Sequence, residues 1–172
     1  MTVKNQKRNL KLEQEFLMAV RKGEPVSVLK DYVDRGVPIG CSDGSGRTGL
    51  HCSAIRGLYE QGKYFLDGGV SPDVRDNDDN TPMHDVAAGG SLRFALMLRK
   101  RGARTDAVNK HLEIPFVVAV KNKNYNIARA IGSDSKTTNE GLLRKAIEIE
   151  FGTIKEKTQA VGVLISLQRT KA

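Results

Sequence analysis

Two histidines, His51 and His84, are candidates for a metal site or for acid–base catalysis, because imidazole binds metals and exchanges protons near neutral pH. A zinc site takes further ligands, and the sequence supplies none at a metal-binding spacing around this pair. The two histidines are 33 residues apart and end the similar segments Thr48–His51 and Thr81–His84. Their equivalence favours a structural role over a metal or acid–base site. We expect no metal and no cofactor.

Aspartates gather between residues 73 and 79, and hard cations such as calcium bind clustered carboxylates. The spacing of these aspartates does not match a known calcium-binding loop. We favour a solvated acidic loop that can also contact a partner. Its carboxylates belong to Asp73, Asp76, Asp78 and Asp79.

The two cysteines, Cys41 and Cys52, match no metal motif in their spacing, and two thiols cannot form a disulfide framework for 172 residues. No neighbour in the sequence activates Cys52 as a nucleophile. The segment Gly44–Gly46 is glycine-rich, but it lacks the lysine and the strand-to-helix context of a phosphate-binding loop. We expect reduced thiols, a flexible loop tip at residues 44–46 and no catalytic residue.

A 33-residue period runs through the middle of the chain. Thr48–His51 is followed at this spacing by Thr81–His84 and then by Ile114–Val117. A fixed period of this length indicates stacked structural units rather than one globular core. The same spacing relates Asp43, Asp76 and Asn109; Gly57 and Gly90; and Gly69 and Gly102.

The clearest unit begins at Thr81, a good helix N-cap, before Pro82, whose missing N–H costs nothing at the first helical position. Gly89–Gly90 is predicted to end this first helix. Ser91 can cap a second helix, which Gly102 ends in a left-handed turn. A polar, turn-forming stretch follows. The predicted unit is therefore helix, turn, helix and a projecting loop or β-hairpin, which we call a finger.

Other segments follow this unit less closely. Residues 43–75 repeat it with Gly49 at the proline position, and residues 109–132 keep the proline but lose the threonine cap and the histidine. A helix pair between residues 13 and 36 is predicted to be an N-terminal capping repeat. The period ends after residue 132, and apolar residues at helical spacing predict two further helices in residues 133–172. That pair either caps the stack or itself binds a partner.

The chain resembles ankyrin-repeat proteins, and the residues that carry the resemblance best are Asn80–His84, the small residues Ala87 and Ala88, and Gly90. The resemblance implies an all-α repeat fold, an ankyrin-like solenoid of helix–turn–helix units with projecting fingers. It also implies that the histidines bond loop groups within the scaffold. About four repeats are expected. The predicted divisions are a basic N-terminal segment (1–12), the ankyrin-repeat domain (13–132) and a C-terminal helical cap (133–172).

Composition sets limits on the class of protein. The formal net charge of +8 favours attraction to nucleic acid, acidic proteins or anionic membrane surfaces. The basic stretches contain few aromatic residues, however, so we assign most of them to a solvated convex face. Residues 1–12 carry no apolar run, and we expect neither a signal peptide nor membrane insertion. We predict a cytoplasmic protein.

The resemblance implies binding through the finger tips and the exposed face of the first helix of each unit. We therefore predict a non-enzymatic adaptor or inhibitor of one protein partner. The alternative is a binder of nucleic acid or anionic surfaces that is driven by charge; an enzyme site around residues 133–135 is the weakest hypothesis. The predicted partner-binding residues are Arg47, Cys52, Ile55, Arg56, Asn77, Asp78, Asp79, Asn80, Asp85, His111, Glu113, Lys121 and Asn122.

Overall fold

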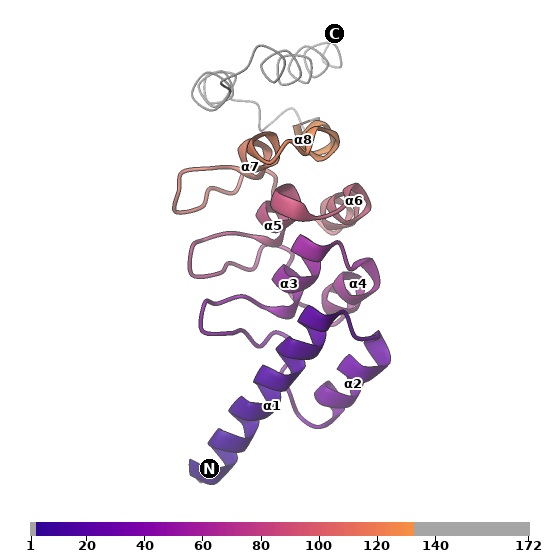
Figure 1. Cartoon of the computed structure of the whole chain (residues 1–172), viewed down its shortest axis with the longest axis vertical. Helices are drawn as coiled ribbons and strands as arrows, with labels where there is room; N and C mark the ends of the chain where they lie inside the picture. The colour runs from indigo at the N-terminus through magenta and orange to yellow at the C-terminus, as the bar shows by residue number, and fades with distance from the viewer. Residues whose placement is uncertain (1–2, 133–172) are drawn as a thin grey trace.

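The structure is a computed structural model that describes residues 3–132, and in this range the chain forms α-helices and no β-strand. The helices pair in sequence, and each pair stacks on the next (Figure 1). The helices are α1 (Val3–Lys22), α2 (Val26–Asp34), α3 (Gly49–Arg56), α4 (Tyr59–Asp67), α5 (Pro82–Gly89), α6 (Leu92–Lys100), α7 (Pro115–Lys121) and α8 (Tyr125–Gly132). α3, α5 and α7 form an inner row beside the fingers, and α4, α6 and α8 form an outer row. The predicted all-α ankyrin-like solenoid is confirmed.

The helix boundaries of the clearest unit follow its sequence signals. α5 begins with Pro82 directly after Thr81, as predicted, and ends at Gly89. The hydroxyl of Ser91 accepts a hydrogen bond from the amide of Phe94 over 3.2 Å and caps α6. Gly102 has a φ of 81°, the left-handed conformation expected after the second helix.

Gly49 replaces the proline of the other repeats for a steric reason. A Cβ atom at Gly49 would lie 2.3 Å from Cζ of Phe65, because the phenyl ring of α4 packs directly against the backbone of α3. Phe65 is fully buried. The phenyl ring of Phe65 in α4 therefore requires a residue without a Cβ atom, glycine, at the start of α3.

The fourth helix pair forms although its sequence departs most from the repeat. Lys123, with a φ of 61°, takes the left-handed position between α7 and α8. The side-chain amide of Asn124 donates to the carbonyl oxygens of Ala87 (2.9 Å) and Ala88 (3.2 Å) near the end of α5. This contact binds the fourth pair to the third.

The N-terminal end of the stack is formed by α1 and α2. α1 starts at Val3 and continues without a break through residue 12, so the basic segment set apart in the sequence analysis lies largely within this helix. The predicted C-terminal cap, residues 133–172, lies outside the described residues. The proposed division of the chain at residues 12 and 132 stays a prediction.

Candidate functional site

Each finger is shaped by one polar side chain that folds the loop around itself. Asp76 Oδ1 accepts hydrogen bonds from the amides of Asp78 (2.9 Å) and Asn80 (2.8 Å). Asn109 makes the equivalent bonds one repeat later, with the amides of the second and fourth residues after it (both 3.0 Å). Asp43 does the same in the first finger, over 2.9 and 3.0 Å. The 33-residue spacing of these three residues therefore reflects identical loop geometry.

Neighbouring fingers are hydrogen-bonded to one another through their backbones. The amide of Asn77 donates to the carbonyl of Ser45 over 2.9 Å, and the amide of Lys110 donates to the carbonyl of Asp78 over 3.0 Å. The Asn77 side chain adds a 3.1 Å bond to the carbonyl of Gly44. The three fingers, which project to one side of the stack in Figure 1, consequently form one connected surface.

The two histidines join successive repeats. His84 Nδ1 accepts from the amide of Thr81 (3.1 Å), while Nε2 lies 3.1 Å from the carbonyl oxygen of Glu113. His51 makes the same contacts with the amide of Thr48 (3.2 Å) and the carbonyl of Asn80 (3.1 Å). An amide can only donate and a carbonyl can only accept, so both imidazoles are neutral with the proton on Nε2. The scaffold role predicted for these histidines is confirmed.

Burial lowers the pKa of both imidazoles, partly offset by the hydrogen bonds to Asn80 and Glu113. His51 and His84 are almost completely inaccessible to solvent. The neutral form that the hydrogen bonds require is thus also the form that burial favours. Neither imidazole is available to a substrate.

Arg47 connects the first finger to α5 through buried carboxylates. Its guanidinium lies 2.9 Å from Asp85 Oδ1 and 3.5 Å from Asp76 Oδ2. The second oxygen of Asp85, Oδ2, is buried without a hydrogen-bond partner. Burial raises the pKa of Asp85 to about 7, although the Arg47 charge acts in the opposite direction. Asp85 is only 5% exposed, so the expectation that it belongs to an exposed helix face was wrong.

Asp76 was also expected in a solvated acidic loop, and the structure buries it as the organiser of the second finger. Asp78, at the tip of the same finger, is exposed. The carboxylates of this segment therefore divide into structural and surface groups.

Cys52 is buried in α3, which contradicts its predicted place on an exposed surface. Burial raises the pKa of its thiol, and the nearby Arg21 and Arg47 only partly oppose this effect. Burial likewise raises the pKa of Cys41 to about 12. A thiol with a raised pKa carries little thiolate at neutral pH and is a poor nucleophile.

The remaining predicted residues lie in the fingers and at the C-terminal ends of α3 and α7. The backbone hydrogen bonds from Asn77 to Ser45 and from Lys110 to Asp78 hold the finger residues of this set close together. Ile55 and Arg56 lie in the last turn of α3, and Lys121 lies at the end of α7. The exposed members of the set are Ile55, Arg56, Asn77, Asp78, His111, Lys121 and Asn122; the half-buried members are Arg47, Asp79, Asn80 and Glu113.

Leu112 is a surface residue that the sequence analysis missed. It lies in the third finger, is 83% exposed and has a φ of 60°. The equivalent positions of the other fingers, Gly46 and Asp79, are also left-handed, with φ of 74° and 60°. The period alone could have identified the position, because Leu112 stands 33 residues after Asp79 and 66 after Gly46. The sequence did not reveal that this position is left-handed and solvent-exposed.

The described residues 3–132 contain neither a cluster of metal ligands nor a membrane-spanning helix. In this part of the chain, no three histidine, cysteine, aspartate or glutamate side chains lie together in a way that could hold a metal ion. None of the helices described is both long enough and apolar enough to cross a membrane.

Comparison with known proteins agrees with the geometry. Residues 16–109 match a family model described as ankyrin repeats (3 copies). The chain is 33% identical over 92 residues to human oxysterol-binding protein-related protein 1, a match that covers 52% of this chain and 10% of the relative. It is 30% identical over 93 residues to 26S proteasome non-ATPase regulatory subunit 10 of Dictyostelium discoideum, covering 53% and 40%.

A third relative is neurogenic locus notch homolog protein 1 of Mus musculus, 27% identical over 97 residues that cover 55% of this chain and 4% of the relative. The matched segment thus spans less than half of each of these proteins. Ankyrin repeats generally mediate protein–protein interaction, and their fold is a non-enzymatic interaction fold. The family match, the stacked helix pairs and the connected fingers together lead to one identification: the chain belongs to the ankyrin-repeat family.

Proposed function

We propose that this protein is a non-enzymatic adaptor or inhibitor that binds one protein partner through its fingers and the C-terminal ends of α3 and α7. The observation that carries the proposal is Leu112. A leucine in the left-handed conformation costs roughly 1–2 kcal/mol, and a leucine exposed to water gains nothing from burial. The fold does not need leucine here, because glycine and aspartate occupy the same position in the other fingers. Backbone strain at a residue whose apolar side chain is accessible is typical of a binding site.

The connections between the fingers support the same proposal. Binding costs less when the contacting residues are already fixed in position, because little conformational entropy is then lost. The backbone bonds of Asn77 and Lys110 to the preceding fingers fix the tips in this way. An exposed loop residue on a rigid support is a favourable place for partner contacts.

The polar residues of the surface define the kind of partner. The second finger presents Asp78, whereas the third presents His111 beside Leu112. Asp85 cannot supply an accessible acidic group, because it is buried against Arg47. The proposed partner therefore offers an apolar pocket for Leu112 and a basic group opposite the second finger.

Site-specific photocrosslinking tests this proposal directly. A photoreactive amino acid is placed at Asp78 or His111 in the fingers, and at Lys100 on the outer helix α6 as the control. The proteins are expressed in host cells, irradiated, and their crosslinked products identified by mass spectrometry. We expect one protein to be crosslinked from both finger positions and not from Lys100.

The opposite pattern would contradict the proposal. Products that form from Lys100 but not from Asp78 or His111 would place the binding surface on the outer helices. Crosslinks to nucleic acid from the basic outer surface would favour the alternative that charge drives binding to a polyanion.

A further inference from the structure

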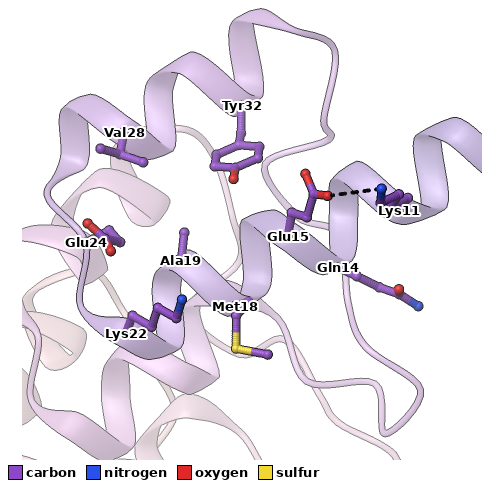
Figure 2. A pocket seen from close by; sticks show the side chains of 9 residues that line it. All are labelled: Lys11, Gln14, Glu15, Met18, Ala19, Lys22, Glu24, Val28 and Tyr32. Carbon is purple, nitrogen blue, oxygen red and sulfur yellow. Dashed lines mark ion pairs between the residues drawn. The ribbon is translucent and has the colours of Figure 1, made fainter.

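The N-terminal end of the described stack carries a groove between α1 and α2, with a volume of about 550 Å³ (Figure 2). Met18 from α1 and Val28 from α2 line it and are 50% and 37% exposed. Tyr32 and Ala19 contribute further apolar surface. The end repeats of a solenoid usually present a polar outer face, because no further repeat covers them. This end face is partly apolar.

The charged residues of the groove are evenly balanced and lie towards its two ends. Lys11 and Glu15 lie at one end, and Lys22 and Glu24 lie at the other, with Met18 between them (Figure 2). The chain as a whole has a net charge of +8, yet this groove contains as many carboxylates as ammonium groups. A polyanion or a strongly acidic protein would be repelled as much as attracted here. The equal numbers of lysines and glutamates instead suit a partner surface that carries the same charges in the opposite order along the groove.

The spacing of the charged residues along α1 allows a second, antiparallel α1 to present its charges in this opposite order. Lys11, Glu15, Met18 and Lys22 follow one another at intervals of four, three and four residues, which places them on one face of a helix. With a rise of about 1.5 Å per residue, Glu15 and Lys22 lie roughly 4.5 and 6 Å from Met18 along the axis, on opposite sides. A second α1 that crosses in the antiparallel direction at Met18 therefore brings each Lys22 beside the other chain's Glu15.

We propose that two copies of this chain associate through this groove about a twofold axis that passes near Met18. In a twofold interface every contact occurs twice, so Lys22 of each copy faces Glu15 of the other. The flexible Met18 side chains fill the apolar floor between Val28 and Tyr32. No finger residue lines the groove, so the fingers are not part of this interface.

Sedimentation velocity of the full chain over a wide concentration range tests the proposal. We expect a reversible monomer–dimer equilibrium for the wild type. Met18→Lys should weaken the dimer at least about tenfold, because it places two lysines together at the axis without replacing a buried core residue. Lys30→Glu, on α2 outside the groove, makes the same charge change as Lys22→Glu and should leave the equilibrium unchanged. Circular dichroism establishes that each variant is folded.

Charge exchange distinguishes this interface from any other mode of association. Glu15→Lys and Lys22→Glu should each weaken self-association, because each places like charges opposite one another. A mixture of the two single variants should recover a mixed dimer, since both facing pairs are then of opposite charge. A wild type that stays monomeric at every concentration would overturn the proposal. So would a dimer that persists in Met18→Lys, or single charge variants that do not pair when mixed.

Discussion

His84 Nε2 lies 3.1 Å from the backbone carbonyl oxygen of Glu113, and this hydrogen bond joins α5 to the finger of the next repeat. His51 and Asn80 repeat the relationship one unit earlier, at the same distance. These two bonds cross the interfaces on which a stacked protein depends, because each repeat is stabilised mainly by its neighbours. The histidines thus contribute to the connected finger surface rather than to any chemistry on a substrate.

Replacing His84 with alanine should lower the free energy of unfolding by about 2–3 kcal/mol. The substitution leaves the buried amide of Thr81 and the carbonyl of Glu113 without partners, and each unsatisfied group costs roughly 1–3 kcal/mol. Urea unfolding of the purified protein measures the change. His111→Ala is the matched control, because His111 is exposed, and it should change stability by less than about 0.5 kcal/mol. Equal losses in both variants would show that the bonds between repeats add little.

Asp85→Asn should change the pH dependence of stability in a defined direction. The folded-state pKa of Asp85 is raised from 3.8 to about 7, so folded Asp85 holds its proton over a range in which unfolded Asp85 has lost it. The contribution of Asp85 to stability is fully present below about pH 4 and is lost as the pH rises through 7. The stability of the wild type relative to Asp85→Asn should fall by about 1.4 kcal/mol per pH unit in this window.

The comparison isolates Asp85, because His51 and His84 are present in both proteins and their lowered pKa values have the opposite effect. Chemical denaturation at several values of pH gives the difference directly. A wild type that gains stability over the variant as the pH rises would mean that the ion pair with Arg47 outweighs burial.

Gly49→Ala should destabilise the protein by about 1–3 kcal/mol, even though alanine favours helices more than glycine does. The added methyl group would collide with Phe65. Phe65→Leu is expected to reduce this penalty when the two changes are combined, since it removes the ring from the site of collision. Gly44→Ala, where no atom lies within 4 Å of an added Cβ, serves as the control. Thermal unfolding is measured for Gly49→Ala, Phe65→Leu, the double variant and Gly44→Ala. The steric explanation is disproved if Gly49→Ala destabilises the Phe65→Leu protein as much as it destabilises the wild type.

The repeat architecture was predictable because it depends on local signals that recur. Thr81 and Ser91 are the N-caps of α5 and α6, and Pro82 is the first residue of α5, as expected. The 33-residue equivalence of Asp43, Asp76 and Asn109 likewise anticipated their common loop geometry. Each of these features is decided by residues close together in the sequence.

The errors concern residues whose surroundings come from another repeat. Asp85 is buried because Arg47, 38 residues earlier, lies against it, and no local pattern contains that contact. Cys52 is buried at the equivalent position of α3. Leu112 was missed for a related reason: a leucine is ordinarily expected in a core, and only the backbone geometry shows that this one is exposed.

Leu112→Gly should raise the free energy of unfolding by about 0.5–1 kcal/mol. Glycine removes the left-handed backbone strain, which stabilises the folded state by roughly 1–2 kcal/mol. It also makes the unfolded chain more flexible, which lowers the free energy of unfolding by about 0.4–1 kcal/mol. Thermal or urea unfolding measures the difference. A loss of stability would mean that Leu112 supports the fold, which would remove the reason to regard it as a binding residue.

The most direct measurement of the proposed function is the affinity of the purified crosslinked partner for the wild type, Leu112→Gly and Asp79→Gly. The two variants place glycine at equivalent left-handed positions of neighbouring fingers, so they differ in the side chain that is removed rather than in the backbone position. If Leu112 anchors the partner, Leu112→Gly should weaken binding at least about tenfold, whereas Asp79→Gly should have a much smaller effect. An affinity of Leu112→Gly equal to that of the wild type would contradict the central claim.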